Sequence, residues 1–190
     1  MLEKYPQILV IPIDNRPVCY DLIKDTAKIF NGLNIHLPDK KLLGNLNSAA
    51  DVIGLQNWFK ETIINNDIDI AIFSLDTLVY GGLVPSRRTS ANFDEVKSYV
   101  DSFVSILKSS PKNIKTYAMS SIMRISNNNY NEEEKGYWGT YGVDLFRYSY
   151  LSHKLLKSYN LELEAELIAL SKKIPFTYCI ILNFRLEYTS

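Results

Sequence analysis

The sequence predicts an α/β fold, in which a parallel sheet of at least four strands carries helices on both faces. Short apolar segments alternate along the chain with longer segments of helical periodicity, which is the pattern of strand–helix–strand crossovers. The apolar segments are rich in β-branched residues, as expected for strands that are covered on both sides. An open sheet of the Rossmann-like or flavodoxin-like kind fits this pattern, and part of a β/α barrel is the alternative.

Four segments are expected to form the strands of this sheet. The third of them, IDIAIFSL, is the clearest, because it is a nearly uninterrupted apolar run of strand length. The first, QILVIPI, has the same character and stops at a polar turn. The expected strands are 7–13, 33–38, 68–75 and 113–123.

Helices are expected between these strands. Apolar residues recur at helical spacing over 22–30, and Gly32 is a suitable stop. Ser48 is expected to open a second helix, since a hydroxyl side chain can accept a hydrogen bond from the free amides of a first turn. Asn92 and Glu95 have the spacing of a capping pair before a third helix.

The chain is expected to change character after the fourth strand. From about Glu132 it turns helical, with helices at 143–159 and 161–174. The end, FTYCIILNFRLEYTS, is apolar and β-like; a premature stop in a decaying gene would produce it, and a last strand, YCIILNF, is the alternative. The predicted parts are an α/β domain at 1–130, a helical segment at 131–175 that packs on it or leads to a missing part, and an atypical tail at 176–190.

Composition restricts the class of partner. Lys+Arg and Asp+Glu both number 21, so the chain lacks the basic excess that attracts nucleic acids or anionic membranes. No apolar run approaches the roughly 18 residues of a membrane span, and the start MLEKYPQ does not resemble a signal peptide. A cytoplasmic protein with a small-molecule ligand is therefore expected, and its oligomeric state is left open.

Polar residues follow three of the four predicted strands. In parallel α/β folds the carboxyl ends of the strands face one crevice, where ligands bind. Asp14 follows the first strand and Asp76 the third, and these two carboxylates are the expected catalytic pair. The residues expected to bind substrate are Asn15, Arg16, Tyr80, Gly81, Gly82, Arg87 and Arg124.

Structural explanations of the same residues stay open. Because a buried carboxylate is costly unless it is paired or solvated, the aspartates and arginines could form an ion-pair network at the sheet edge. The Gly81–Gly82 pair fits a tight turn as well as close approach by a ligand. The acidic run 132–134 is expected to open a helix. The sequence has no GxGxxG, GKS/GKT, HExxH, CxxC or GxSxG motif.

Several of these segments together suggest a family. ILVIPIDNRPVCYDL, LPDKKLLGN, SLDTLVYGGLVPSR and SSIMRIS occur in an order and spacing that resembles the domain of unknown function 4127 family, from about Ile8 to Pro175. The resemblance implies a bacterial α/β protein and marks the nine candidate residues as motif positions. It also implies a chain longer than this one, so a truncated member is expected, and it supplies no reaction.

Two functions are therefore expected as alternatives. The first is a hydrolase, glycosidase-like, in which Asp14 and Asp76 divide acid, base or nucleophile work on a small polar or carbohydrate substrate. The second is a non-catalytic small-molecule or anion-binding domain, or an inactive gene remnant. No cofactor and no metal site is predicted; a divalent ion with the two aspartates as oxygen ligands is the alternative, but the sequence offers no obvious third ligand for it.

Overall fold

The computed structural model describes residues 5–30, 33–122, 125–175 and 177–178, and these form parts of two compact units. The N-terminal unit comprises Met1–Ile122 and the C-terminal unit Met123–Ser190. The boundary predicted near residue 130 thus falls within the second unit. Most of the predicted tail, and the predicted helix stop at Gly32, lie outside the described residues.

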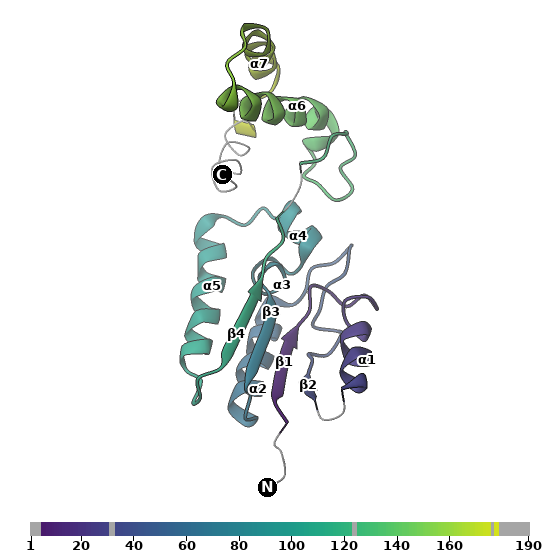
Figure 1. Cartoon of the computed structure of the whole chain (residues 1–190), viewed down its shortest axis with the longest axis vertical. Coiled ribbons are helices and arrows are strands. Elements are labelled where there is room, and N and C mark those ends of the chain that lie inside the picture. The colour runs from purple at the N-terminus through teal and green to yellow at the C-terminus, as the bar shows by residue number, and fades with distance from the viewer. Residues whose placement is uncertain (1–4, 31–32, 123–124, 176, 179–190) are drawn as a thin grey trace. The chain divides into compact units, whose positions relative to one another are not determined.

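The N-terminal unit is built on a parallel sheet (Figure 1). Among the described residues it has four strands in the order β2-β1-β3-β4, and every pair is parallel. The predicted α/β fold with a parallel sheet is confirmed. The barrel alternative is wrong. In a β/α barrel consecutive strands are neighbours, so β2 would pair with β3, whereas here β1 pairs with β3. The strands are β1 (Gln7–Ile11), β2 (Asn34–His36), β3 (Ile70–Ser74) and β4 (Lys115–Met119).

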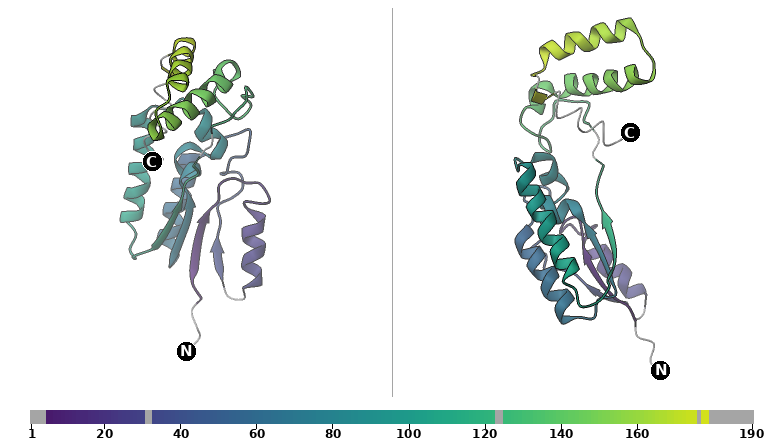
Figure 2. Two further views of the ribbon diagram at one scale, coloured as in Figure 1. Left: turned by 45° about the horizontal axis from the view of Figure 1, so that its top comes forward. Right: turned by 90° about the vertical axis from the view of Figure 1, so that its left-hand side faces the viewer.

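Helices cover the two faces of this sheet unequally. Helices α2 and α5 lie against one face and α1 against the other, as the right-hand view of Figure 2 shows. Two short helices, α3 and α4, follow β3 beyond its carboxyl end. The bounds are α1 (Asp21–Ile29), α2 (Val52–Asn65), α3 (Leu75–Tyr80), α4 (Leu83–Arg88) and α5 (Phe93–Lys108).

The main core lies between the sheet and the pair α2 and α5. Strand register places Leu9 beside Ala71 and Ile11 beside Phe73, so these four side chains share one face. All four are buried. Phe73 packs edge-on against Phe103 of α5, with ring centroids 4.8 Å apart, and the same Phe103 ring lies 4.9 Å from that of Phe59 of α2. The members of this core are Leu9, Ile11, Leu43, Ala50, Leu55, Phe59, Ile63, Ile68, Ala71, Phe73, Leu78, Phe103 and Ile114.

The helix starts test the capping predictions. Asn92 and Glu95 form a complete capping box at α5, as predicted. The expected start of α2 at Ser48 is wrong, because its N-cap is Asp51, whose carboxylate accepts from the Gly54 amide. Ser48 instead belongs to a turn in which its amide donates to the Asn45 side chain.

The C-terminal unit contains a hairpin of two helices, α6 (Trp138–Lys157) and α7 (Leu161–Lys173). Arg147 donates two hydrogen bonds to the Glu166 carboxylate, at 2.6 and 2.7 Å, and so joins the two helices. The run 132–134 does not open α6, whose first residue is Trp138. None of the helices that the structure describes is long and apolar enough to cross a membrane.

Candidate functional site

The strand order indicates where a ligand site should lie at the carboxyl-terminal edge of the sheet, the edge formed by the carboxyl ends of the strands. The connection from β1 leads outward to β2, whereas β3 connects to β4 on the opposite side, so the order reverses between β1 and β3. In open parallel sheets, ligands bind outside the carboxyl ends of the strands at such a point. Asp14 follows β1 and Asp76 follows β3, so the fold brings both predicted aspartates to this edge.

The two segments that carry these aspartates are tied together by Thr77. Its hydroxyl lies against two carbonyl oxygens that end β1, those of Pro12 at 3.1 Å and Ile13 at 2.8 Å. Thr77 is fully buried. Since Ile13 precedes Asp14 and Thr77 follows Asp76, this contact fixes the backbones of the two acidic residues next to each other.

The Asp14 carboxylate is hydrogen-bonded within its own loop, to Arg16. It accepts from the Arg16 amide at 3.0 Å and from Arg16 Nε at 2.8 Å, and Arg16 Nη2 lies 2.6 Å away. Burial raises the pKa of Asp14, but the hydrogen bonds from the Arg16 side chain and amide together outweigh it, so this pKa lies below its usual value. The guanidinium of Arg16 therefore pairs with Asp14 and leaves no full charge for a substrate.

Asp76 has different surroundings. It is 5% exposed in the first turn of α3, where Ser74 caps the helix by accepting from the Thr77 amide. Its Oδ2 accepts from the backbone amide of Ser121, just after β4, at 2.9 Å. Asp76 thus joins β3 to the segment that follows β4, through a carboxylate that takes part in no ion pair within the described residues.

A groove of about 620 Å³ begins beside Asp76 and runs along the α1 face of the sheet. Its floor is the row of apolar side chains that includes Val10 and Ile72, and its walls are α1 and the end of β4. Polar side chains gather where Asp76 lies. The lining residues used below are Val10, Leu22, Ile72, Ser74, Asp76 and Met119.

Asn15 and Gly81 hold the loop that precedes α2. The Asn15 amide donates to the Gly44 carbonyl at 2.9 Å, and its side chain donates to Leu43 O at 3.3 Å. Gly81 has a φ of +83°, and a Cβ there would come within 2.9 Å of the Ala49 Cβ. Both residues thus have structural roles in this loop.

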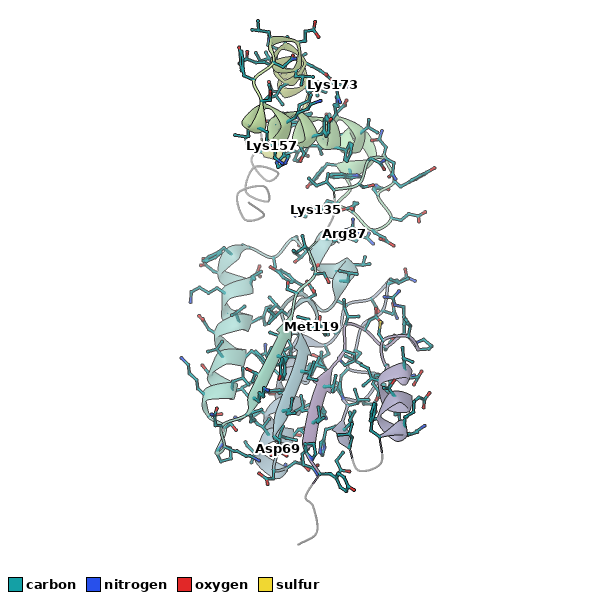
Figure 3. The ribbon with its side chains drawn as sticks, viewed as in Figure 1. Asp69, Arg87, Met119, Lys135, Lys157 and Lys173 are labelled. Atoms are coloured by element: carbon teal, nitrogen blue, oxygen red, sulfur yellow. The ribbon has the colours of Figure 1, made fainter. Side chains whose placement is uncertain are left out.

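Other predicted residues lie away from the groove. Tyr80 lines a separate hollow of about 440 Å³, together with Asn47 and Arg88. Arg87 is on α4, beyond the strand ends (Figure 3). Gly82 is buried, with a φ of +135°, and its amide donates to Asp76 O. Arg124 lies outside the described residues. The roles assigned to these residues stay predictions.

Sequence reasoning missed Thr77 and Cys19. A hydroxyl that bonds to a distant strand has no sequence signature, although Thr77 adjoins a predicted site residue. Cys19 lines the groove and contacts Asp14. Burial, together with the Asp14 carboxylate, raises the pKa of the Cys19 thiol, which disfavours a thiolate nucleophile. No three acidic, His or Cys side chains cluster as a metal site in the described ranges.

The fold and this edge define a doubly wound α/β protein with two aspartates at its topological switch point. Comparison with known families then gives a more particular result. The chain belongs to the family described as "Protein of unknown function (DUF4127)", whose model matches residues 8–180. This confirms the resemblance, which was expected to extend over 8–175. No curated protein and no solved structure matches the chain.

Proposed function

We propose that the N-terminal unit binds a small organic molecule in the groove, and that Asp76 is the polar group that contacts it. The observation that carries this proposal is the position of Asp76: a carboxylate that is 5% exposed lines the groove where it meets the switch point. Ligand sites in proteins are concave, mostly apolar and of about 300–1,000 Å³, with a few polar groups that fix orientation.

The groove offers this combination on one side of the sheet. Its volume of about 620 Å³ suits a drug-sized molecule, and Asp76 lines it together with Ser74 at the end of β3 and with Ser120 and Ser121, which follow β4. The loop contacts of Asn15 and Thr77 hold that end in place without using Asp76. Asp76 therefore has a rigid surrounding and a carboxylate whose contact in the described chain is a single backbone amide.

A second candidate is a hydrolase that acts on a small polar or carbohydrate substrate. The observation that favours it is that two carboxylates at the same end of the sheet have unlike surroundings: Asp14 lies beside the Arg16 guanidinium, and Asp76 lines the apolar groove. Such differences allow one carboxyl group to act as an acid and another as a base or nucleophile. In this mechanism Asp76 would donate the proton, and Asp14, held ionised by Arg16, would act on the opposite side.

A fragment screen tests the first proposal. The full chain, labelled with 15N, would be titrated with a library of neutral, cationic and anionic fragments, and amide shifts would be mapped. We expect shifts at β1, β3 and α1, and at least a tenfold weaker affinity for bound fragments in Asp76→Asn, which keeps an acceptor for the Ser121 amide. The proposal fails if no fragment shifts amides that line the groove.

The hydrolase candidate needs its own readout. A panel of 4-nitrophenyl glycosides and esters would be assayed with the wild-type chain, Asp76→Asn and Asp94→Asn, an exposed carboxylate on α5 that serves as the control. Loss of turnover in Asp76→Asn alone, with fragment affinity retained, would favour the hydrolase. Unchanged turnover in Asp76→Asn would remove this candidate and leave the binding proposal standing.

A further inference from the structure

The groove is apolar along most of its length and polar at one end, and this difference restricts the kind of ligand that fits it. Its body is apolar: Val10 and Ile72 form the floor, Leu22 of α1 forms one wall, and Met119 of β4 the other. Leu22 and Met119 are 57% and 53% exposed, so this apolar surface is open to solvent. Figure 3 shows Met119 at the carboxyl end of β4, at the same edge as the switch point.

Among the described residues, the charge at the polar end of the groove comes from the Asp76 carboxylate. Of the two aspartates at this edge, Asp14 is neutralised by Arg16 through bonds of 2.6 to 3.0 Å. Asp76 contacts an uncharged amide, that of Ser121, and has no ion pair in the described ranges. A carboxylate with little water around it favours a cationic or hydrogen-bond-donating group close by.

We propose, on the basis of the proposed function, that the ligand is an amphipathic amine. Its ammonium head contacts Asp76, and its apolar body lies along Val10 and Ile72 between α1 and β4. An anionic head would meet the Asp76 carboxylate with repulsion, and a sugar would leave its hydroxyl groups against an apolar floor without partners. The volume of about 620 Å³ accepts a body of drug size.

A matched series of probes tests the head and the body separately. Octylamine, 1-octanol and octanoate share one tail, while butylamine and hexylamine share the head of octylamine. Binding to the full 15N-labelled chain would be followed by amide shifts. We expect octylamine to bind tightest of the three octyl probes, and affinity to rise about fourfold for each added methylene in the amine series.

Two pairs of variants sharpen the test. Asp76→Asn should weaken octylamine about tenfold and bring it level with 1-octanol, while Asp94→Asn leaves it unchanged. Leu22→Asn, in the groove wall, should weaken octylamine but not butylamine. Ile29→Asn is the matched control, because Ile29 is an exposed α1 residue, 77% exposed, that does not line the groove.

The outcomes separate this inference from the proposed function. If the three octyl probes shift the groove amides equally, the ammonium head is wrong and the binding site remains. If polar fragments bind and no octyl probe does, the apolar body is wrong. If neither probes nor fragments bind, the proposed function fails as well. A dimer in sedimentation that Met119→Lys dissociates would show that a second copy covers this face, which also overturns the inference.

Discussion

The two faces of the sheet in the N-terminal unit differ in how completely they are covered. On the face of α2 and α5, Leu9 and Ala71 are fully buried and Phe73 packs against an aromatic neighbour. On the α1 face, the register places Tyr117 beside Ile72, and Tyr117 is 46% exposed. The same strands therefore supply a closed core on one side and an open apolar surface on the other.

The cause of this difference is the strand order. Crossovers between parallel strands are right-handed, so the direction of each step across the sheet decides which face its helix covers. The steps from β2 to β3 and from β3 to β4 run one way and place α2 and α5 on the same face. The step from β1 to β2 runs the other way and places α1 alone on the second face, which leaves the groove.

The largest expected effect tests the closed face. Phe59→Ala removes a fully buried ring from the aromatic cluster and should lower the free energy of unfolding by about 3–5 kcal/mol. Tyr117→Ala on the open face should cost within about 1 kcal/mol. Urea denaturation of both variants measures the difference. Equal losses would mean that the open face is covered in solution, and the comparison would break down.

Removal of the tie between the two acidic segments should have the next largest effect. Thr77→Val keeps the shape of the side chain but leaves the carbonyls of Pro12 and Ile13 without this donor, at a cost of about 1–3 kcal/mol. Thr116→Val, on exposed β4, is the control and should change stability by at most about 0.5 kcal/mol. A Thr77→Val chain as stable as the wild type would show that the switch point is not held by this hydroxyl.

Gly81→Ala tests the turn between α3 and α4, which packs against the loop before α2. A side chain at φ +83° is strained, and its Cβ would lie 2.9 Å from the Ala49 Cβ, so we expect a loss of about 1–3 kcal/mol. Gly136→Ala is the contrast, because a Cβ there meets nothing within 4 Å. Thermal unfolding of the two variants should separate them, and similar melting temperatures would contradict the structural role assigned to Gly81.

The smallest expected effect is the pH dependence of Asp14. Because the pKa of Asp14 is lowered in the folded chain, its contribution to stability is present above the unfolded pKa of about 3.9 and is lost as pH falls through the folded value. In Arg16→Gln the guanidinium no longer lowers this pKa, so the pKa of Asp14 is higher than in the wild-type chain. The loss of stability in this variant should therefore be smaller at pH 4 than at pH 7, as measured by urea titration. Equal losses at both pH values would contradict the pairing.

The sequence predicted the elements better than their ends. Continuous apolar runs identified β1 and β3, the two central strands, because burial leaves a local pattern there. The outer strands β2 and β4 contain no buried residue, and their predicted segments mix apolar and polar residues. The Asn92–Glu95 box was also readable, since a cap involves residues three positions apart. The start of α2 was not, because Ser48 and Asp51 both suit a cap and only the loop contact of Asn45 with Ser48 decided between them.

The candidate site likewise has features that local sequence patterns predict and features that only tertiary contacts decide. The sequence by itself determined that Asp14 and Asp76 stand at the ends of parallel strands, since strand ends and polar residues are local features. Tertiary structure alone decided that β1 and β3 are neighbours, that the Asp76 carboxylate accepts from the Ser121 amide, and that Tyr80 lines another hollow. Those facts depend on contacts between distant segments, and no local pattern of residues records which segments meet.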